Sequence, residues 1–250
     1  MPTAAPDTLR VVLVIDDTSA RRSLVRGTTL GAEEAARTGA MFGTPVALRI
    51  VVRAGFESMS RAALSHASRV TRPSLYIVAG DSLLCSEVAL QGGRDSTPVL
   101  DAGCPPASGA AGADRATVYT IDSRATVPAP AGAPASAAPD SSHLELWVAS
   151  LEKFGGEQLN QRFRRRFGAP MDSDAWAGWF AMKIALDLAL HAHASSGGAL
   201  LARLADPATS FDGQKGRPLR FSATAHRLVQ PLYRVTGSGA DAHVVEEVVR

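Results

Sequence analysis

Two adjacent acids and an arginine pair follow the first apolar run of the chain. Asp16 and Asp17 end the stretch "VVLVIDD", and Arg21 and Arg22 open the helical stretch that comes next. Paired acids after a buried strand can hold Mg²⁺ beside a phosphate-accepting aspartate, whereas arginines bind carboxylates and phosphates through paired hydrogen bonds. A phosphate-accepting site of this kind also needs a lysine after a late strand, and the chain contains no lysine before Lys153. We therefore reject phosphoryl-transfer chemistry for this junction.

The apolar pattern predicts the elements that would position these residues. Five short runs rich in β-branched and aliphatic residues are typical of buried strands, and helical stretches at residues 21–38 and 57–71 separate the first three. Apolar strands that alternate with helices predict a parallel sheet with right-handed crossovers and helices on both faces. The predicted fold class is therefore α/β, a three-layer, doubly wound parallel sheet. The predicted strands are residues 9–15, 46–52, 75–79, 98–100 and 117–121.

Doubly wound sheets bind ligands at the carboxyl ends of their strands, so the residues that follow each strand are the candidate binding residues. Small and polar residues there can present backbone N–H groups to a ligand. The same residues can serve as ordinary helix caps, and the sequence leaves both roles open. The candidates are Asp17, Thr18, Ser19, Arg21, Arg22, Arg53, Asp81, Ser82, Leu83, Asp101, Ala102, Gly103 and Arg124.

The two cysteines of the chain, Cys85 and Cys104, follow neighbouring predicted strands. Their loops would then lie close enough for a disulfide, which would imply an oxidising compartment. Two reduced, half-buried thiols are the alternative. Two cysteines are too few for a disulfide scaffold or a four-cysteine zinc site.

Composition limits the classes of function. With 250 residues, of which 46% are hydrophobic and 20% charged, the chain is an ordinary globular protein of one or two domains. A formal net charge of +2 is too small to indicate nucleic-acid binding, and no apolar stretch reaches the length of a membrane helix. The sequence lacks a G-x-S-x-G motif, a P-loop and metal-spaced His or Cys residues. We therefore expect neither an enzyme nor a metal protein.

The second half of the chain has a different organisation. Residues 124–143 are nearly all Ala, Pro, Ser and Gly, which predicts an extended linker that cannot pack a core. Residues 144–168 have an apolar spacing that predicts a helix, and residues 172–198 form a helix with an Asp/Ser start and a Gly stop. A shorter helix and a turn-rich segment that leads into strands complete the chain.

Several of these segments resemble a known family. The helix "AWAGWFAMKIALDLAL" and the later "FDGQKGRPLRF…HR…PLYRV" resemble the C-terminal part of type 1 periplasmic binding proteins, the solute receptors of branched-chain amino-acid ABC transporters. "RGTTLGAEEAARTGAMFGTPVALRIV" resembles their first helix and second strand, and "GDSLLCSEVA" with "TPVLDAGCPP" resembles their ligand-facing loops. Within the family, "EKFGGEQLNQRFRRRFGAPMDSDAWAGW" is most similar to the substrate-binding proteins associated with pyrroloquinoline quinone (PQQ)-dependent alcohol dehydrogenase systems. The resemblance covers residues 9–124 and about 145–236.

The resemblance implies a single binding lobe, because the family has two lobes joined by a hinge and the linker stands where the second lobe would be. We expect residues 9–124 to form the first part of one α/β lobe and residues 125–143 to replace the second lobe. Residues 144–236 would complete the lobe, and residues 237–250 would form a C-terminal tail. Because the family is exported, the resemblance favours the Cys85–Cys104 disulfide and a periplasmic location after removal of a signal peptide.

These features together predict a periplasmic binding protein that carries a small anionic solute, without catalysis and without a required cofactor. The stretch from Asp16 to Arg22 would form one wall of its site. PQQ, a flat tricarboxylate, ranks first as ligand, with Arg21 or Arg22 pairing its carboxylates and Trp176 and Trp179 near its rings. Core packing is the alternative role for both tryptophans.

Two other functions stay open at this point. One is the binding of an amino-acid-type solute, and the other is a single-lobe interaction or sensor module that docks a PQQ-dependent dehydrogenase. The expected partners are the small anionic molecule and an ABC permease or such a dehydrogenase, but neither nucleic acid nor an inserted membrane segment. A single lobe also leaves one face of the ligand open, which a second subunit could cover in a homodimer.

Overall fold

The computed structural model describes residues 7–53, 68–106, 116–124, 142–237 and 242–248. Most of the predicted helix at residues 57–71 lies outside these ranges, and its last residues, 68–71, are helical. Most of the predicted linker and part of the predicted tail also lie outside the described residues.

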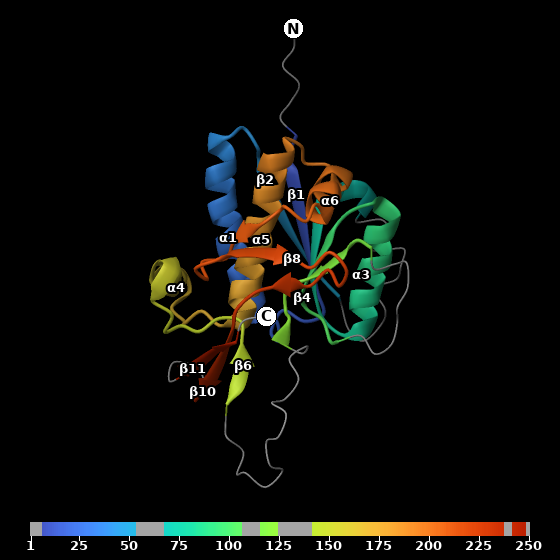
Figure 1. Cartoon of the computed structure of the whole chain (residues 1–250). Coiled ribbons are helices and arrows are strands. Elements are labelled where there is room, and N and C mark those ends of the chain that lie inside the picture. Colours follow the sequence, from blue (N-terminus) through green and yellow to red (C-terminus); the bar gives the residue numbers. More distant parts are fainter. Residues whose placement is uncertain (1–6, 54–67, 107–115, 125–141, 238–241, 249–250) are drawn as a thin grey trace.

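Five parallel strands form the main sheet in the order β2-β1-β3-β4-β5 (Figure 1). The α/β prediction is confirmed, and the apolar runs locate the five strands of this sheet to within a few residues. The last two boundaries shift, because β4 continues to Gly103 and β5 ends at Thr120. The strands are β1 (Leu9–Ile15), β2 (Val46–Val52), β3 (Leu75–Ala79), β4 (Val99–Gly103) and β5 (Val118–Thr120).

Helices cover both faces of this sheet because successive strand residues point to opposite sides. Leu13 of β1 belongs to the core that also contains residues of α1 (Arg22–Met41) and α5 (Ser173–Ala192). Val12 and Val14 belong to the core under α3 (Ser82–Asp95). Figure 1 shows α1 and α5 on one side of the sheet and α3 on the other.

Glycines let α1 and α5 approach each other closely. A Cβ atom on Gly27 would lie 1.8 Å from the backbone oxygen of Ala175, and one on Gly178 would lie 2.5 Å from the backbone oxygen of Leu24. Neither helix can accept a side chain at these points, so the contact of the two backbones fixes α5 against the sheet.

The predicted helix at residues 144–168 is wrong in its first half. Residues 143–145 form β6 (His143–Glu145), which pairs with β10 (Leu232–Thr236). Only α4 (Gly156–Phe167) is an α-helix, and it follows the 3₁₀ turn η3 (Lys153–Gly155). The Ser173 hydroxyl binds the backbone N–H groups of Leu146 and Trp147, and Phe154 has a positive φ of 57°. These tertiary bonds and the left-handed residue outweigh the local helical spacing.

The C-terminal segment forms strands, as its turn-rich sequence predicts. After α6 (Gly197–Ala205), β7 (Phe211–Asp212), β8 (Pro218–Phe221) and β9 (Leu228–Val229) form one small antiparallel sheet. β10 (Leu232–Thr236) and β11 (His243–Val248) join β6 in another, which projects away from the main sheet in Figure 1. None of the described helices combines the length and the apolar character that a membrane span requires.

Candidate functional site

Charged side chains gather at the carboxyl ends of the parallel strands, an edge of the sheet that we call the carboxyl edge. After β1, Arg21 Nε donates to Asp16 Oδ1 at 3.0 Å. Burial would raise the pKa of Asp16, but the hydrogen bond and the charge of Arg21 outweigh it and lower the pKa. Arg21 therefore already has a carboxylate partner.

The next arginine along the edge is paired as well. Arg53 Nη1 donates to Asp81 Oδ1 at 3.0 Å, and Nη2 bonds the second oxygen of the same carboxylate. Asp81 is also the N-cap of α3, where it accepts a bond from the backbone N–H of Leu84 at 2.9 Å. The Arg53 hydrogen bond lowers the pKa of Asp81, so this pair stays ionised and fixes the start of α3.

Arg124 has three acidic partners. Its guanidinium contacts Asp122 at 2.7 Å, Glu145 at 3.1 Å and Asp174 at 3.2 Å. Burial raises the pKa of Asp174 despite the charge of Arg124. The three arginines Arg21, Arg53 and Arg124 thus face five carboxylates in these pairs, so the charge of each is already offset by at least one acid.

The remaining candidates after β1 and β3 are exposed. Asp17 Oδ1 accepts bonds from the N–H group of Ser19 at 2.6 Å and from its hydroxyl at 2.7 Å, which lowers the pKa of Asp17. This is an ordinary turn, the capping alternative left open by the sequence. The other exposed candidates are Thr18, Arg22, Ser82 and Leu83, with Leu83 51% exposed.

A groove of about 470 Å³ runs beside the carboxyl edge on the α3 side of the sheet. Its apolar floor consists of one face of β3, β4 and β5, and α3 forms one wall. The turn at residues 224–227 forms the opposite wall, because Thr120 of β5 donates its N–H to the carbonyl of His226 at 2.8 Å. The lining includes Val78, Val99, Val118, Ser82, Ser86, Cys85, Cys104, Asp101, Thr120, Asp122, His226 and Arg227.

Asp101 is the most perturbed acid of this groove. Its Oδ1 accepts the backbone N–H groups of Gly103 at 3.1 Å and Cys104 at 2.8 Å, and the Thr120 hydroxyl lies 3.3 Å from Oδ2. Burial raises the pKa of Asp101 to about 6, more than these bonds lower it, and the charge of Asp122 adds to the rise. A cation in the groove would stabilise this carboxylate.

A disulfide joins Cys85 of α3 to Cys104 after β4, with 6.1 Å between the Cα atoms. It is the pair predicted from the neighbouring strand ends. Both cysteines line the groove, so the disulfide is part of its wall.

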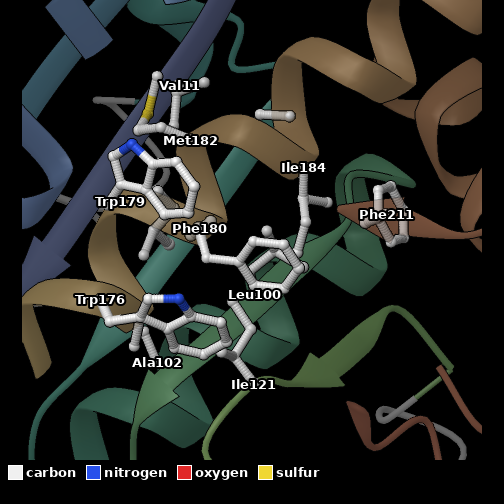
Figure 2. Close-up of a cluster of buried hydrophobic side chains, with 14 of the residues drawn as sticks. Val11, Leu100, Ala102, Ile121, Trp176, Trp179, Phe180, Met182, Ile184 and Phe211 are labelled. Carbon is white, nitrogen blue, oxygen red and sulfur yellow. The ribbon is translucent and has the colours of Figure 1, made fainter. Parts of the chain in front are cut away.

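The two tryptophans proposed for ligand stacking lie in the core instead. Trp176 is 0% exposed, stacks between Trp147 and Phe180, and donates its indole N–H to the carbonyl of Gly213 at 3.2 Å. Trp179 is 2% exposed. Figure 2 shows Trp176 beside Ala102, whose side chain is likewise buried, so all three candidates are core residues. Because the first turns of α5 are buried, neither tryptophan presents an exposed ring to a ligand.

The structure thus brings only Ser82 and Asp101 of the predicted ligand-binding residues into the groove. Of the predicted arginines, Arg21, Arg53 and Arg124 lie in ion pairs at the edge, and Arg22 is exposed. Sequence reasoning missed Thr120, Asp122 and Arg227. Asp122 directly follows a predicted strand and could have been included. Arg227 carries no local signal, because only the bridge between Thr120 and Arg227 brings it to the sheet. Among the described residues, no group of three or more His, Cys, Asp or Glu side chains could hold a metal ion.

Solved structures share the fold of this chain. An ABC transporter substrate-binding protein from Sphaerobacter thermophilus superposes with a TM-score of 0.75 at 14% identity, over 97% of this chain and 98% of that chain. This chain has the fold of a transporter substrate-binding protein. No protein-family model matches it, and no curated protein matches it in sequence.

Two further neighbours were solved with ligands. The branched-chain amino-acid transporter substrate-binding protein of Streptococcus pneumoniae, in complex with isoleucine, has a TM-score of 0.72 at 10% identity, over 97% of this chain and 100% of that chain. A solute-binding protein of Rhodopseudomonas palustris, in complex with benzoate, has a TM-score of 0.67 at 16% identity, over 97% of this chain and 96% of that chain. These neighbours are binding proteins, and nothing in the comparisons supports PQQ or a missing lobe.

Proposed function

We propose that this chain binds a small solute in the groove beside the carboxyl edge and delivers it to an ABC permease without catalysis. The observation that carries this proposal is a groove at the carboxyl edge whose lining combines the acid Asp101 and the cation Arg227 with apolar strand residues. Its volume of about 470 Å³ lies in the range of small-molecule sites, and its surface is about evenly polar and apolar.

The charges of the groove favour a solute with an amine. Asp101 can accept hydrogen bonds from an ammonium group, and Arg227 can pair a carboxylate of the same molecule. An amino-acid-type solute with an apolar side chain satisfies both residues and the apolar part of the floor. Such a ligand agrees with the isoleucine-bound neighbour, although the low identity to that protein transfers only the fold.

PQQ ranks second among the proposed solutes. Its three carboxylates need several free cations, whereas Arg21, Arg53 and Arg124 each have acidic partners. Its flat rings would also need an exposed aromatic face, and Trp176 is in the core. No observation favours a dehydrogenase partner or a homodimer.

The periplasm is the proposed location, and a single lobe the proposed architecture. A disulfide suits an oxidising compartment, and one neighbour is titled a periplasmic binding protein from Burkholderia mallei. The described parallel strands all belong to one sheet, which is compatible with one lobe.

Isothermal titration calorimetry at pH 7.5 tests the function. We would titrate branched-chain and basic amino acids, simple amines, benzoate and PQQ into the wild-type protein. Hydrogen bonds to charged groups contribute roughly 1.5–3 kcal/mol each, so Asp101→Asn should weaken amine binding about 10- to 150-fold. Arg22→Gln, an exposed change outside the groove, is the control. Tight PQQ binding that Asp101→Asn leaves intact but Arg22→Gln weakens would contradict the proposal and restore the anionic ligand.

A further inference from the structure

We propose that the Cys85–Cys104 disulfide positions Asp101 for solute binding, so that a dithiol reductant lowers the affinity of the groove. The effect on affinity rests on the proposed function, whereas the effect on Asp101 does not. Cys85 and Cys104 line the wall of the groove, and Asp101 lines its floor.

The loop after β4 holds Asp101 by its backbone. β4 contains an irregularity at this point, since Val78 pairs with Asp101 but Ala79 pairs with Gly103, and such bulges re-aim neighbouring side chains. The N–H groups of Gly103 and Cys104 then donate to Asp101 Oδ1. The next two residues are prolines, which have no N–H to donate, so a sheet ladder cannot continue here.

The disulfide ties this loop to a firmly fixed helix end. Cys85 lies in the first turns of α3, and its N–H donates to the carbonyl of Asp81 at 3.1 Å. Asp81 is held by Arg53 and by the N–H of Leu84. The contacts therefore run from Arg53 through Asp81 and Cys85 to Cys104, and from the Cys104 N–H to Asp101.

Reduction would break this connection at one covalent bond. A thiolate of the dithiol attacks one sulfur and forms a mixed disulfide, and its second thiol then displaces that sulfur. The reductant leaves as a disulfide, while Cys85 and Cys104 gain two electrons and two protons as thiols. Both cysteines are half-buried and line the groove, so a small dithiol can reach them.

The released loop no longer fixes two N–H donors on Asp101. The acid would then lose hydrogen bonds that lower its pKa, while burial and the charge of Asp122 would continue to raise it. His226 and Arg227 face the groove from the turn opposite, and α3 contributes the serines Ser82 and Ser86. Asp101 would therefore be neutral over more of the pH range and would bind an ammonium group less well.

Two measurements on the full chain test this role. The first is ligand-free: carbon NMR follows the titration of the Asp101 carboxyl group in the oxidised protein, in the protein treated with dithiothreitol, and in the double variant Cys85→Ser/Cys104→Ser. We expect a higher pKa in the reduced and variant proteins than in the oxidised protein. The second is calorimetry with the amine solute that binds the wild type, where we expect about a tenfold or greater loss of affinity on reduction at pH 7.

Three outcomes separate the possibilities. An unchanged Asp101 pKa after reduction, or a loss of fold detected by circular dichroism, overturns the positioning role. The positioning role is supported if reduction raises the pKa of Asp101 and lowers the solute affinity of the wild type. In Asp101→Asn, reduction should then leave the affinity unchanged. A raised pKa in a protein that binds none of the tested solutes supports the positioning of Asp101 and contradicts the proposed function.

Discussion

Asp101 keeps a negative charge in a place where burial disfavours it. Its two backbone donors and the Thr120 hydroxyl only partly compensate for the lost water, so its pKa is about 6. The residue is thus close to its protonation point near neutral pH. This makes it sensitive both to a bound cation and to acid.

We predict that the affinity for an amine solute falls as the pH falls through 6. Above this value Asp101 is a carboxylate and accepts hydrogen bonds from the ammonium group, whereas below it the acid is neutral. Calorimetry between pH 5 and pH 8 should show about a tenfold decrease per pH unit on the acidic side, since one proton competes with the cation. In Asp101→Asn the same profile should be flat between pH 5.5 and pH 7, and an unchanged slope in this variant would contradict the role of Asp101.

Trp176 is predicted to support the fold and not the ligand. The ring is enclosed by aromatic neighbours, and the Nζ atom of Lys215 lies 4.0 Å from its centroid while donating to the Gln230 side chain and the Pro231 carbonyl. Trp176→Ala should lower the free energy of unfolding by about 3–5 kcal/mol, and Trp176→Phe should lower it by less. Chemical denaturation measures both values. A stable Trp176→Ala protein that has lost solute affinity would reinstate the stacking hypothesis.

The helices α1 and α5 depend on small residues where their backbones meet. A methyl group at Gly27 would collide with the Ala175 carbonyl, and this backbone atom cannot move out of the way. We therefore predict that Gly27→Ala destabilises the protein by at least about 1–3 kcal/mol, the usual cost of overpacking.

Gly93 in α3 is the matched control for that substitution. Nothing lies within 4 Å of a Cβ atom at this position, so Gly93→Ala should gain about 0.5–1 kcal/mol through helix propensity. Thermal unfolding of both variants provides the measurement. Equal midpoints would show that α1 and α5 can separate, against the packing described above.

Most of the elements could be predicted because their signals are local. The apolar run of β1 and the Asp172 and glycine signals around α5 need no tertiary information. The stretch before α4 could not be predicted, because its conformation depends on Ser173, which is distant in the sequence. The groove was missed for the same reason, since Arg227 reaches β5 only in the folded chain.

The described residues form one parallel sheet with helices on both faces and two small antiparallel sheets. The ion pair between Arg124 and Glu145 joins the residue before the Ala/Pro-rich stretch to the strand after it. The fold matches substrate-binding proteins over nearly their full length, and a scattering measurement tests the number of lobes directly.

Small-angle X-ray scattering should detect a single compact body. A one-domain chain of this length is expected to have a radius of gyration of about 18 Å, and it should change little when solute is added. A clearly larger radius with a second maximum in the distance distribution, and a decrease on solute binding, would indicate two lobes that close on the ligand.

Backbone NMR with an amine-bearing solute tests the location of the site most directly. Increasing amounts of the solute are added to ¹⁵N-labelled protein, and the shifts of the amide signals are mapped on the structure. Our account predicts that the largest changes occur at Gly103, Cys104 and Thr120 and in the turn at residues 224–227, which line or border the groove. Changes centred instead on Asp17 to Arg22, with the groove signals unmoved, would contradict it.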